Sequence, residues 1–136
     1  MNKRYVLDSS AIMAFLEEEA GVDTVEKLLE QAQTKQITVY VSFVTFTEIY
    51  YISIQEQDEK IASERLERIG AMPIFRIESN PELTKLAGEI KAKYRISLAD
   101  TFIAALAKMK DAILVHKDPE FEPLKGQIEM LILPYK

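Results

Sequence analysis

Residues 97–121, SLADTFIAALAKMKDAILVHKDPEF, decide which fold this chain can adopt. The segment begins as an apolar helix after Ser97, continues as the strand-like run AILV, and ends in the polar turn-forming run HKDP. A buried helix that leads into a short β-branched strand and a turn is typical of α/β proteins. In open α/β sheets, chemistry gathers at the carboxyl ends of strands. Asp118 lies at such an end.

Asp100 stands in the helical part of this segment. It is the only ionisable residue between positions 98 and 107, and its neighbours at i+3, i+4 and i+7 are apolar. A bare carboxylate in such surroundings is costly to desolvate. Ser97 can act as an N-cap with Asp100 in the first turn of the helix, a short version of the capping box. The other interpretation is that Asp100 faces a cation.

Two further acids are isolated in the same way. Asp8 is the only charged residue from position 5 to position 16, and Glu48 is the only one from position 39 to position 54. Each also has a capping interpretation, because Asp8 precedes a helix and Thr45 could cap a helix that carries Glu48 in its first turn. Carboxylates that meet in one pocket must take up protons unless a cation lies between them. The joint pattern therefore favours a metal site.

The composition limits the kind of metal. The chain has no cysteine and one histidine, which excludes thiolate nucleophiles, disulfides, cysteine–zinc sites and multi-histidine sites. Asp and Glu oxygens select hard cations, so Mg²⁺ or Mn²⁺ is expected. Such ions support phosphodiester hydrolysis, which predicts a nuclease more readily than a glycosidase.

The chain of 136 residues, 48% of them hydrophobic, is expected to form a single domain over residues 1–136. No low-complexity tract or linker divides it. The first ten residues lack the apolar region of a signal peptide, and no apolar run is long enough to span a membrane, so a cytoplasmic protein without a membrane partner is expected.

Strand-like and helical patterns alternate along the chain. Strands are predicted at 3–7, 37–41, 72–77, 112–115 and 128–133, with helices between them, including one at 46–54 and a charged one at 55–68. Because parallel strands need crossover connections, this order predicts a three-layer α/β/α sandwich with a mostly parallel sheet of about five strands.

The charge is unevenly distributed. The net charge is −5, but residues 85–117 hold seven basic and three acidic residues, a balance of +4, so the remainder carries −9. An acidic chain does not suit general coating of nucleic acid. The basic segment is either a solvated helix face or a place that holds a polyanion near the carboxylates. The candidate phosphate contacts are Lys91, Lys93, Arg95 and Lys117.

Four motifs in order carry a resemblance that spans nearly the whole chain. They are DSSAIMAFL at Asp8, the isolated Glu48 in an aromatic-rich helix, SLADTFIAALA around Asp100 and LVHKDPEF around Asp118. The chain resembles the PIN-domain family and, in size, VapC-type toxins. The resemblance implies a PIN-like fold and a Mg²⁺- or Mn²⁺-dependent endoribonuclease that is usually a homodimer. It also implies a toxin that a small antitoxin neutralises by inserting a C-terminal segment into the active site.

The resemblance also assigns residues. By position, Asp8, Glu48 and Asp100 match the first three acidic ligands of the family, and Asp118 matches the fourth, often more peripheral one. Ser9 matches a hydroxyl that is common beside the first acid.

Family members often carry Thr or Ser two residues before the fourth acid, where this chain has His116. A lone histidine at a strand end is more typical of a surface or hydrogen-bonding residue than of a ligand, but it can alter how water or phosphate is positioned.

Two other functions remain open from the sequence. One is a PIN-like module that binds RNA or a protein partner with little catalysis, which the acidic net charge and His116 favour. The other is a phosphotransfer enzyme of a different α/β class that uses Asp8 as its nucleophile.

Overall fold

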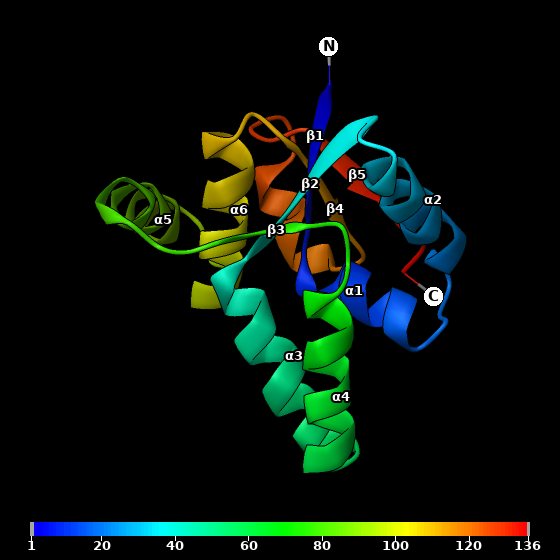
Figure 1. The fold of residues 1–136 in the computed structure, drawn as a ribbon. Coiled ribbons are helices and arrows are strands. Elements are labelled where there is room, and N and C mark those ends of the chain that lie inside the picture. The colour runs from blue at the N-terminus through cyan, green and yellow to red at the C-terminus, as the bar shows by residue number, and fades with distance from the viewer. Residues whose placement is uncertain (1, 136) are drawn as a thin grey trace.

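The computed structural model describes residues 2–135 (Figure 1). Five strands form one sheet in the order β3, β2, β1, β4, β5, and every neighbouring pair is parallel. The strands are β1 (Lys3–Leu7), β2 (Ile37–Ser42), β3 (Phe75–Ile77), β4 (Ile113–His116) and β5 (Met130–Ile132). The predicted sheet of about five mostly parallel strands is confirmed.

Helices cover both faces of this sheet. They are α1 (Ser9–Leu16), α2 (Val22–Gln33), α3 (Phe43–Glu56), α4 (Glu59–Gly70), α5 (Pro81–Lys93), α6 (Leu98–Met109) and the short 3-10 helix η1 (Pro119–Leu124). Figure 1 shows α5 and α6 on one side of the sheet, α1 and α2 on the other, and α3 with α4 projecting beyond its end. The α/β/α expectation is thus confirmed. No helix among residues 2–135 combines the length and apolarity that crossing a bilayer requires.

The alternation of side chains along the central strand creates two cores. Val6 of β1 is fully buried in the cluster formed with α5 and α6, and its neighbour Leu7 is fully buried in the cluster formed with α1 and α2. Successive strand residues point to opposite faces, so one apolar strand serves both layers. Each such fully buried aliphatic side chain contributes about 1.5–3 kcal/mol.

The strand order determines where the chain can present a site. From β1 the order runs to β2 and β3 on one side and to β4 and β5 on the other, so β1 and β4 flank a topological switch point. Leu7 pairs with Val115 at the carboxyl ends of these two strands, and the Asp8 N–H donates to the Val115 carbonyl at 3.1 Å. The residues that follow β1 and β4 therefore start side by side.

Four predicted elements, two helices and two strands, have other bounds in the structure. Helix α3 begins at Phe43, where the Ser42 hydroxyl accepts a hydrogen bond from the Val44 N–H, so Thr45 lies inside the helix and is not its cap. The helix predicted at 55–68 instead begins at Glu59, because Asp58 caps it by accepting from the Ile61 N–H at 2.8 Å. The outer strands β3 and β5 are shorter than predicted, with three residues each.

Candidate metal centre

Three carboxylates from distant parts of the chain meet at the carboxyl end of the sheet. Asp8 follows β1, Asp118 follows β4, and Asp100 lies in the first turn of α6. One carboxylate oxygen of each lies within 4.8 Å of those of the other two. Asp8 and Asp100 are only 2% and 6% exposed. Buried acids this close together form a site that needs a compensating positive charge.

Asp8 acts as a helix cap and also belongs to this acidic group. Its Oδ1 accepts hydrogen bonds from the Ala11 N–H at 3.0 Å and from the Ser10 hydroxyl at 2.6 Å. The Ser10 oxygen in turn accepts from the Lys117 N–H at 2.8 Å. Ser10 thus ties the first acid to the loop that carries Asp118.

Asp100 sits in a capping box that another residue completes. The Ser97 hydroxyl accepts from the Asp100 N–H at 3.2 Å, as the sequence predicts. In a complete box the Asp100 carboxylate would accept from the Ser97 N–H. Here the Glu120 carboxylate accepts that bond. The Asp100 carboxylate therefore makes no hydrogen bond within residues 2–135 and stays available beside Asp8 and Asp118.

Asp118 caps the helix that carries Glu120. Its Oδ1 accepts from the Glu120 N–H at 2.9 Å, which orders the start of η1. The resemblance places the fourth acid at the periphery, yet the Asp118 carboxylate belongs to the close group with Asp8 and Asp100.

Glu48 lies beside the close group and is held by a hydroxyl. Its Oε1 accepts from the Ser9 hydroxyl at 2.5 Å, and Ser9 Oγ also lies 3.3 Å from Thr45 Oγ1. Glu48 is not in the group whose oxygens all lie within 4.8 Å. Its charge nevertheless helps to raise the pKa of Asp8 and of Asp100, so it lies near both carboxylates.

The electrostatics of the site disfavour simultaneous ionisation of Asp8, Glu48 and Asp100. Burial raises the pKa of Asp8 from 3.8 to about 7. Burial, and next the charge of Asp8, raises the pKa of Asp100 from 3.8 to about 8. Burial also raises the pKa of Glu48, against the lowering effect of the Ser9 hydrogen bond. Near neutral pH the group either keeps protons or takes up a cation.

His116 is a buried hydrogen-bonding residue and does not face outward. Its side chain is fully buried, its ring centroid lies 4.9 Å from that of Phe121, and its Nδ1 accepts from the Asp118 N–H at 3.1 Å. Nε2 therefore carries the proton, and within residues 2–135 it has no hydrogen-bond partner. Burial lowers the pKa of His116. Nδ1 is committed to the backbone, so the imidazole positions Asp118.

The four candidate phosphate contacts have different surroundings. The Lys91 ammonium donates to the Ile96 carbonyl at 2.7 Å, and the Lys117 ammonium donates to the Ala20 carbonyl at 2.9 Å. Lys93 lines a cavity beside α5, and Arg95 is exposed. Lys91 and Lys117 thus hold connections within the fold, whereas Lys93 and Arg95 have no ion pair within residues 2–135.

Sequence reasoning missed two residues that shape the site, Ser10 and Glu120. Ser10 looked like an ordinary residue in a first helical turn, and Glu120 stands in an acidic run beside Asp118 and Glu122. One signal for Glu120 existed. Capping boxes prefer Glu or Gln where this chain has the shorter Asp100, so another acceptor could be expected for the Ser97 N–H.

Comparisons with known proteins bear on the family and the fold of the chain. A family model described as PIN domain matches residues 5–126. No curated protein sequence matches the chain.

Among solved structures, VapBC2 from Rickettsia felis bound to a promoter DNA fragment matches with a TM-score of 0.78 and 18% identity, over 96% of this chain and 99% of that one. DNA-bound VapBC from Salmonella typhimurium matches with a TM-score of 0.75 and 17% identity, over 97% and 98%. VapC20 from Mycobacterium tuberculosis, a toxin that cleaves the sarcin-ricin loop, matches with a TM-score of 0.73 and 16% identity, over 96% and 99%. At these identities the likeness shows a shared fold. Because the family model covers most of the sequence, the chain belongs to the PIN-domain family.

Proposed function

We propose that this chain is a metal-dependent endoribonuclease that hydrolyses RNA phosphodiester bonds. The observation that carries the proposal is the meeting of Asp8, Asp100 and Asp118, whose carboxylate oxygens lie within 4.8 Å of one another. Hydrogen bonds occupy only Oδ1 of Asp8 and Oδ1 of Asp118, and Asp100 accepts none within residues 2–135. Each acid thus keeps an oxygen for a ligand.

The donor set fits a hard divalent cation. The chain has no cysteine, and its one histidine is turned to a backbone N–H. Oxygen donors alone favour Mg²⁺ or Mn²⁺ over zinc or copper. Asp8, Asp100 and Asp118 would hold the ion, with Glu48 beside them. Such an ion would supply charge stabilisation for a phosphoryl oxygen and a more acidic water.

The surrounding residues would orient the reaction. The Ser9 hydroxyl holds Oε1 of Glu48 at 2.5 Å, and Oε2 has no hydrogen bond within residues 2–135. Oε2 would accept a proton from the attacking water. Ser10 and His116 together fix the backbone that carries Asp118, because Ser10 accepts from the Lys117 N–H and His116 accepts from the Asp118 N–H. Lys93 and Arg95 would hold phosphates of the RNA, because Lys91 and Lys117 are engaged within the fold.

We also propose that residues 1–136 act as one nuclease unit, a cytoplasmic toxin that forms a homodimer and is neutralised by a small antitoxin. Membership in the PIN-domain family and the fold shared with VapBC complexes support this proposal. Co-expression with the product of an adjacent reading frame should give a stable complex that no longer cuts RNA.

The central experiment measures cleavage of structured RNA by the purified chain. Cleavage should require Mg²⁺ or Mn²⁺, stop with EDTA, and be lost in Asp100→Asn while circular dichroism shows a retained fold. Asp23→Asn, which changes an exposed acid in the first turn of α2, is the matched control and should cut normally. If Asp100→Asn cuts as fast as the parent chain, the proposal is wrong.

The buried His116 favours a second candidate function, a PIN-like module that binds RNA or a protein partner with little catalysis. The side chain stands where the family often has a hydroxyl, and its Nδ1 is taken up by the Asp118 N–H. Retained RNA binding without turnover in either metal would support this function, and recovery of cleavage in His116→Thr would locate the defect.

A further inference from the structure

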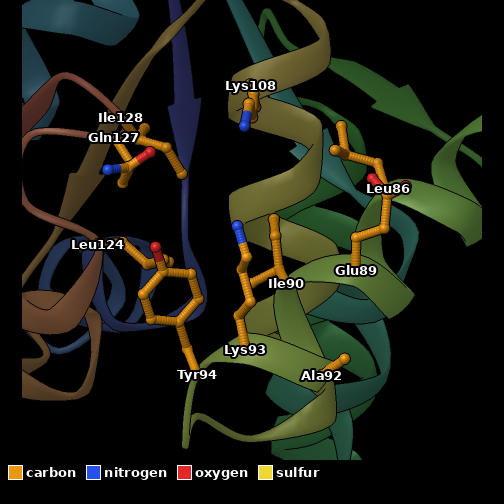
Figure 2. Close-up of a pocket in the computed structure, with 10 residues that line it drawn as sticks. All are labelled: Leu86, Glu89, Ile90, Ala92, Lys93, Tyr94, Lys108, Leu124, Gln127 and Ile128. Carbon is orange, nitrogen blue, oxygen red and sulfur yellow. The ribbon is translucent and has the colours of Figure 1, made fainter.

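A cavity of about 440 Å³ opens between α5, α6 and the segment that follows η1 (Figure 2). Its floor is apolar, because Ile90, Leu124 and Ile128 line it with side chains that are at most 7% exposed. A volume of this size matches pockets that hold small organic groups. The cavity is separate from the acidic group, none of whose carboxylates lines it.

Two lysines point into the mouth of this cavity. Figure 2 shows the Lys93 ammonium, from the end of α5, and the Lys108 ammonium, from the last turn of α6, directed toward one another. Lys93 follows Glu89 by four positions, a spacing that favours an ion pair on a helix. Neither lysine forms an ion pair within residues 2–135, where the cations that do are Arg65, Arg76 and Lys117. Glu89 also lines the cavity, so its three charged residues sum to +1, and neither ammonium group is held in an ion pair among the described residues.

The opposite wall carries an aromatic ring and an amide. Figure 2 shows the Tyr94 ring and the Gln127 side chain across the cavity from the two lysines. An aromatic ring stacks with an unpaired base, a side-chain amide can both donate to and accept from a base edge, and ammonium groups hold phosphate. An aliphatic acid would use the floor and the lysines but neither the ring nor the amide.

The segments around the cavity also build the acidic group. Helix η1 is capped by Asp118 and ends at Leu124 in the cavity floor, and Tyr94 lies three residues before Ser97. The same two segments, before α6 and along η1, thus contribute to both the acidic group and the cavity. We propose that the cavity is a subsite for one unpaired nucleotide of the RNA, with its base against Tyr94 and the apolar floor and its phosphate between Lys93 and Lys108. This inference rests on the proposed action on RNA.

The test is a titration of the full chain in EDTA, followed by amide chemical shifts. The probes are the four nucleoside 5′-monophosphates, with ribose 5-phosphate as a probe that lacks the base. At least one nucleotide should give saturable shifts at Tyr94 and Gln127, and ribose 5-phosphate should bind about fivefold or more weakly. The double variant Lys93→Ala/Lys108→Ala should weaken nucleotide binding about fivefold, from the loss of two exposed charge contacts.

The matched control removes the same charge outside the cavity. Lys85 lies on α5 and Lys125 follows η1, both are exposed, and neither lines the cavity. Lys85→Ala/Lys125→Ala should change nucleotide affinity by less than about twofold. Equal weakening by both double variants, equal binding of ribose 5-phosphate, or no saturable shift at Tyr94 and Gln127 would each overturn the subsite. Because no metal and no cleavage enter this test, nucleotide binding by a chain that never cuts RNA would contradict the nuclease and leave the subsite standing.

Discussion

Replacing Asp100 by Asn should make the metal-free protein more stable and remove its response to divalent cations. The pKa of Asp100 is raised from 3.8 to about 8, and its carboxylate accepts no hydrogen bond within residues 2–135. The substitution therefore removes a repelled charge without breaking a side-chain contact. At 1.36 kcal/mol for each pH unit, that displacement corresponds to about 5–6 kcal/mol at pH 8.

Only part of this cost should appear on substitution. The repulsion is shared with Asp8, water that reaches the site screens it, and Asn loses a favourable charge at the helix N-terminus worth about 0.5 kcal/mol. We expect a gain of about 2 kcal/mol, which for 136 residues raises the Tm in EDTA at pH 8 by about 7 °C.

The assay is thermal unfolding followed by circular dichroism, with EDTA or with Mn²⁺. For the parent chain, Mn²⁺ at about 100 times its Kd should add about 2.7 kcal/mol. Asp100→Asn should lose most of that increase. Asp23→Asn, which changes an exposed acid in the first turn of α2, should change neither value by more than about 2 °C. A Tm of Asp100→Asn below that of the parent in EDTA, with an undiminished Mn²⁺ response, would refute the reasoning.

Three other perturbations test the site. In EDTA the Tm should fall as pH rises from about 5 to about 8 and then level off. The pKa of Asp8 is raised to about 7 and that of Asp100 to about 8, so proton loss costs the folded state more than the unfolded chain. A Tm that is constant in EDTA, or a Mn²⁺ stabilisation that does not grow over this range, would contradict this explanation. Ser10→Ala should cost about 2 kcal/mol in urea unfolding, because it removes the hydroxyl between Asp8 and the Lys117 N–H, and a cost below about 0.5 kcal/mol would show that the link is dispensable. Glu120→Ala should weaken Mn²⁺ binding about tenfold, as measured by calorimetry. Glu120→Gln keeps an acceptor for the Ser97 N–H, so it should bind Mn²⁺ within about twofold of the parent. An equal loss of Mn²⁺ affinity in both variants would make Glu120 a ligand and not a positioning residue.

The layers of the fold were predictable because apolar periodicity records burial. The apolar residues at 112–115 and those of the helix after Ser97 each follow the pattern of a single kind of element. The strand lies within one residue of its predicted bounds, and the helix begins directly after Ser97. The start of α3 was not predictable in the same way. Residues 43–46, FVTF, have a β-branched and aromatic composition that suits a strand. Their sequence therefore does not indicate that the helix begins at Phe43, directly after the Ser42 cap.

The candidate site was predictable to the extent that its acids are isolated in the sequence. Asp8 and Asp100 stand alone in apolar windows, and the structure brings them together with Asp118. The contacts that position them were not predictable, because they join residues distant in sequence. Glu120 reaches back to the Ser97 N–H over 23 positions, and Ser10 accepts from the Lys117 N–H over 107 positions.

The shortness of the two outer strands bears on how copies of this chain can associate. β3 and β5 offer three residues each at the rims of the sheet, so an added strand from another molecule would find little backbone to pair with. Rims this short protect a parallel sheet from growing into an aggregate. Self-association of the native chain should therefore proceed through the outer surfaces of its helices, and dimers and monomers should keep the same five-stranded sheet.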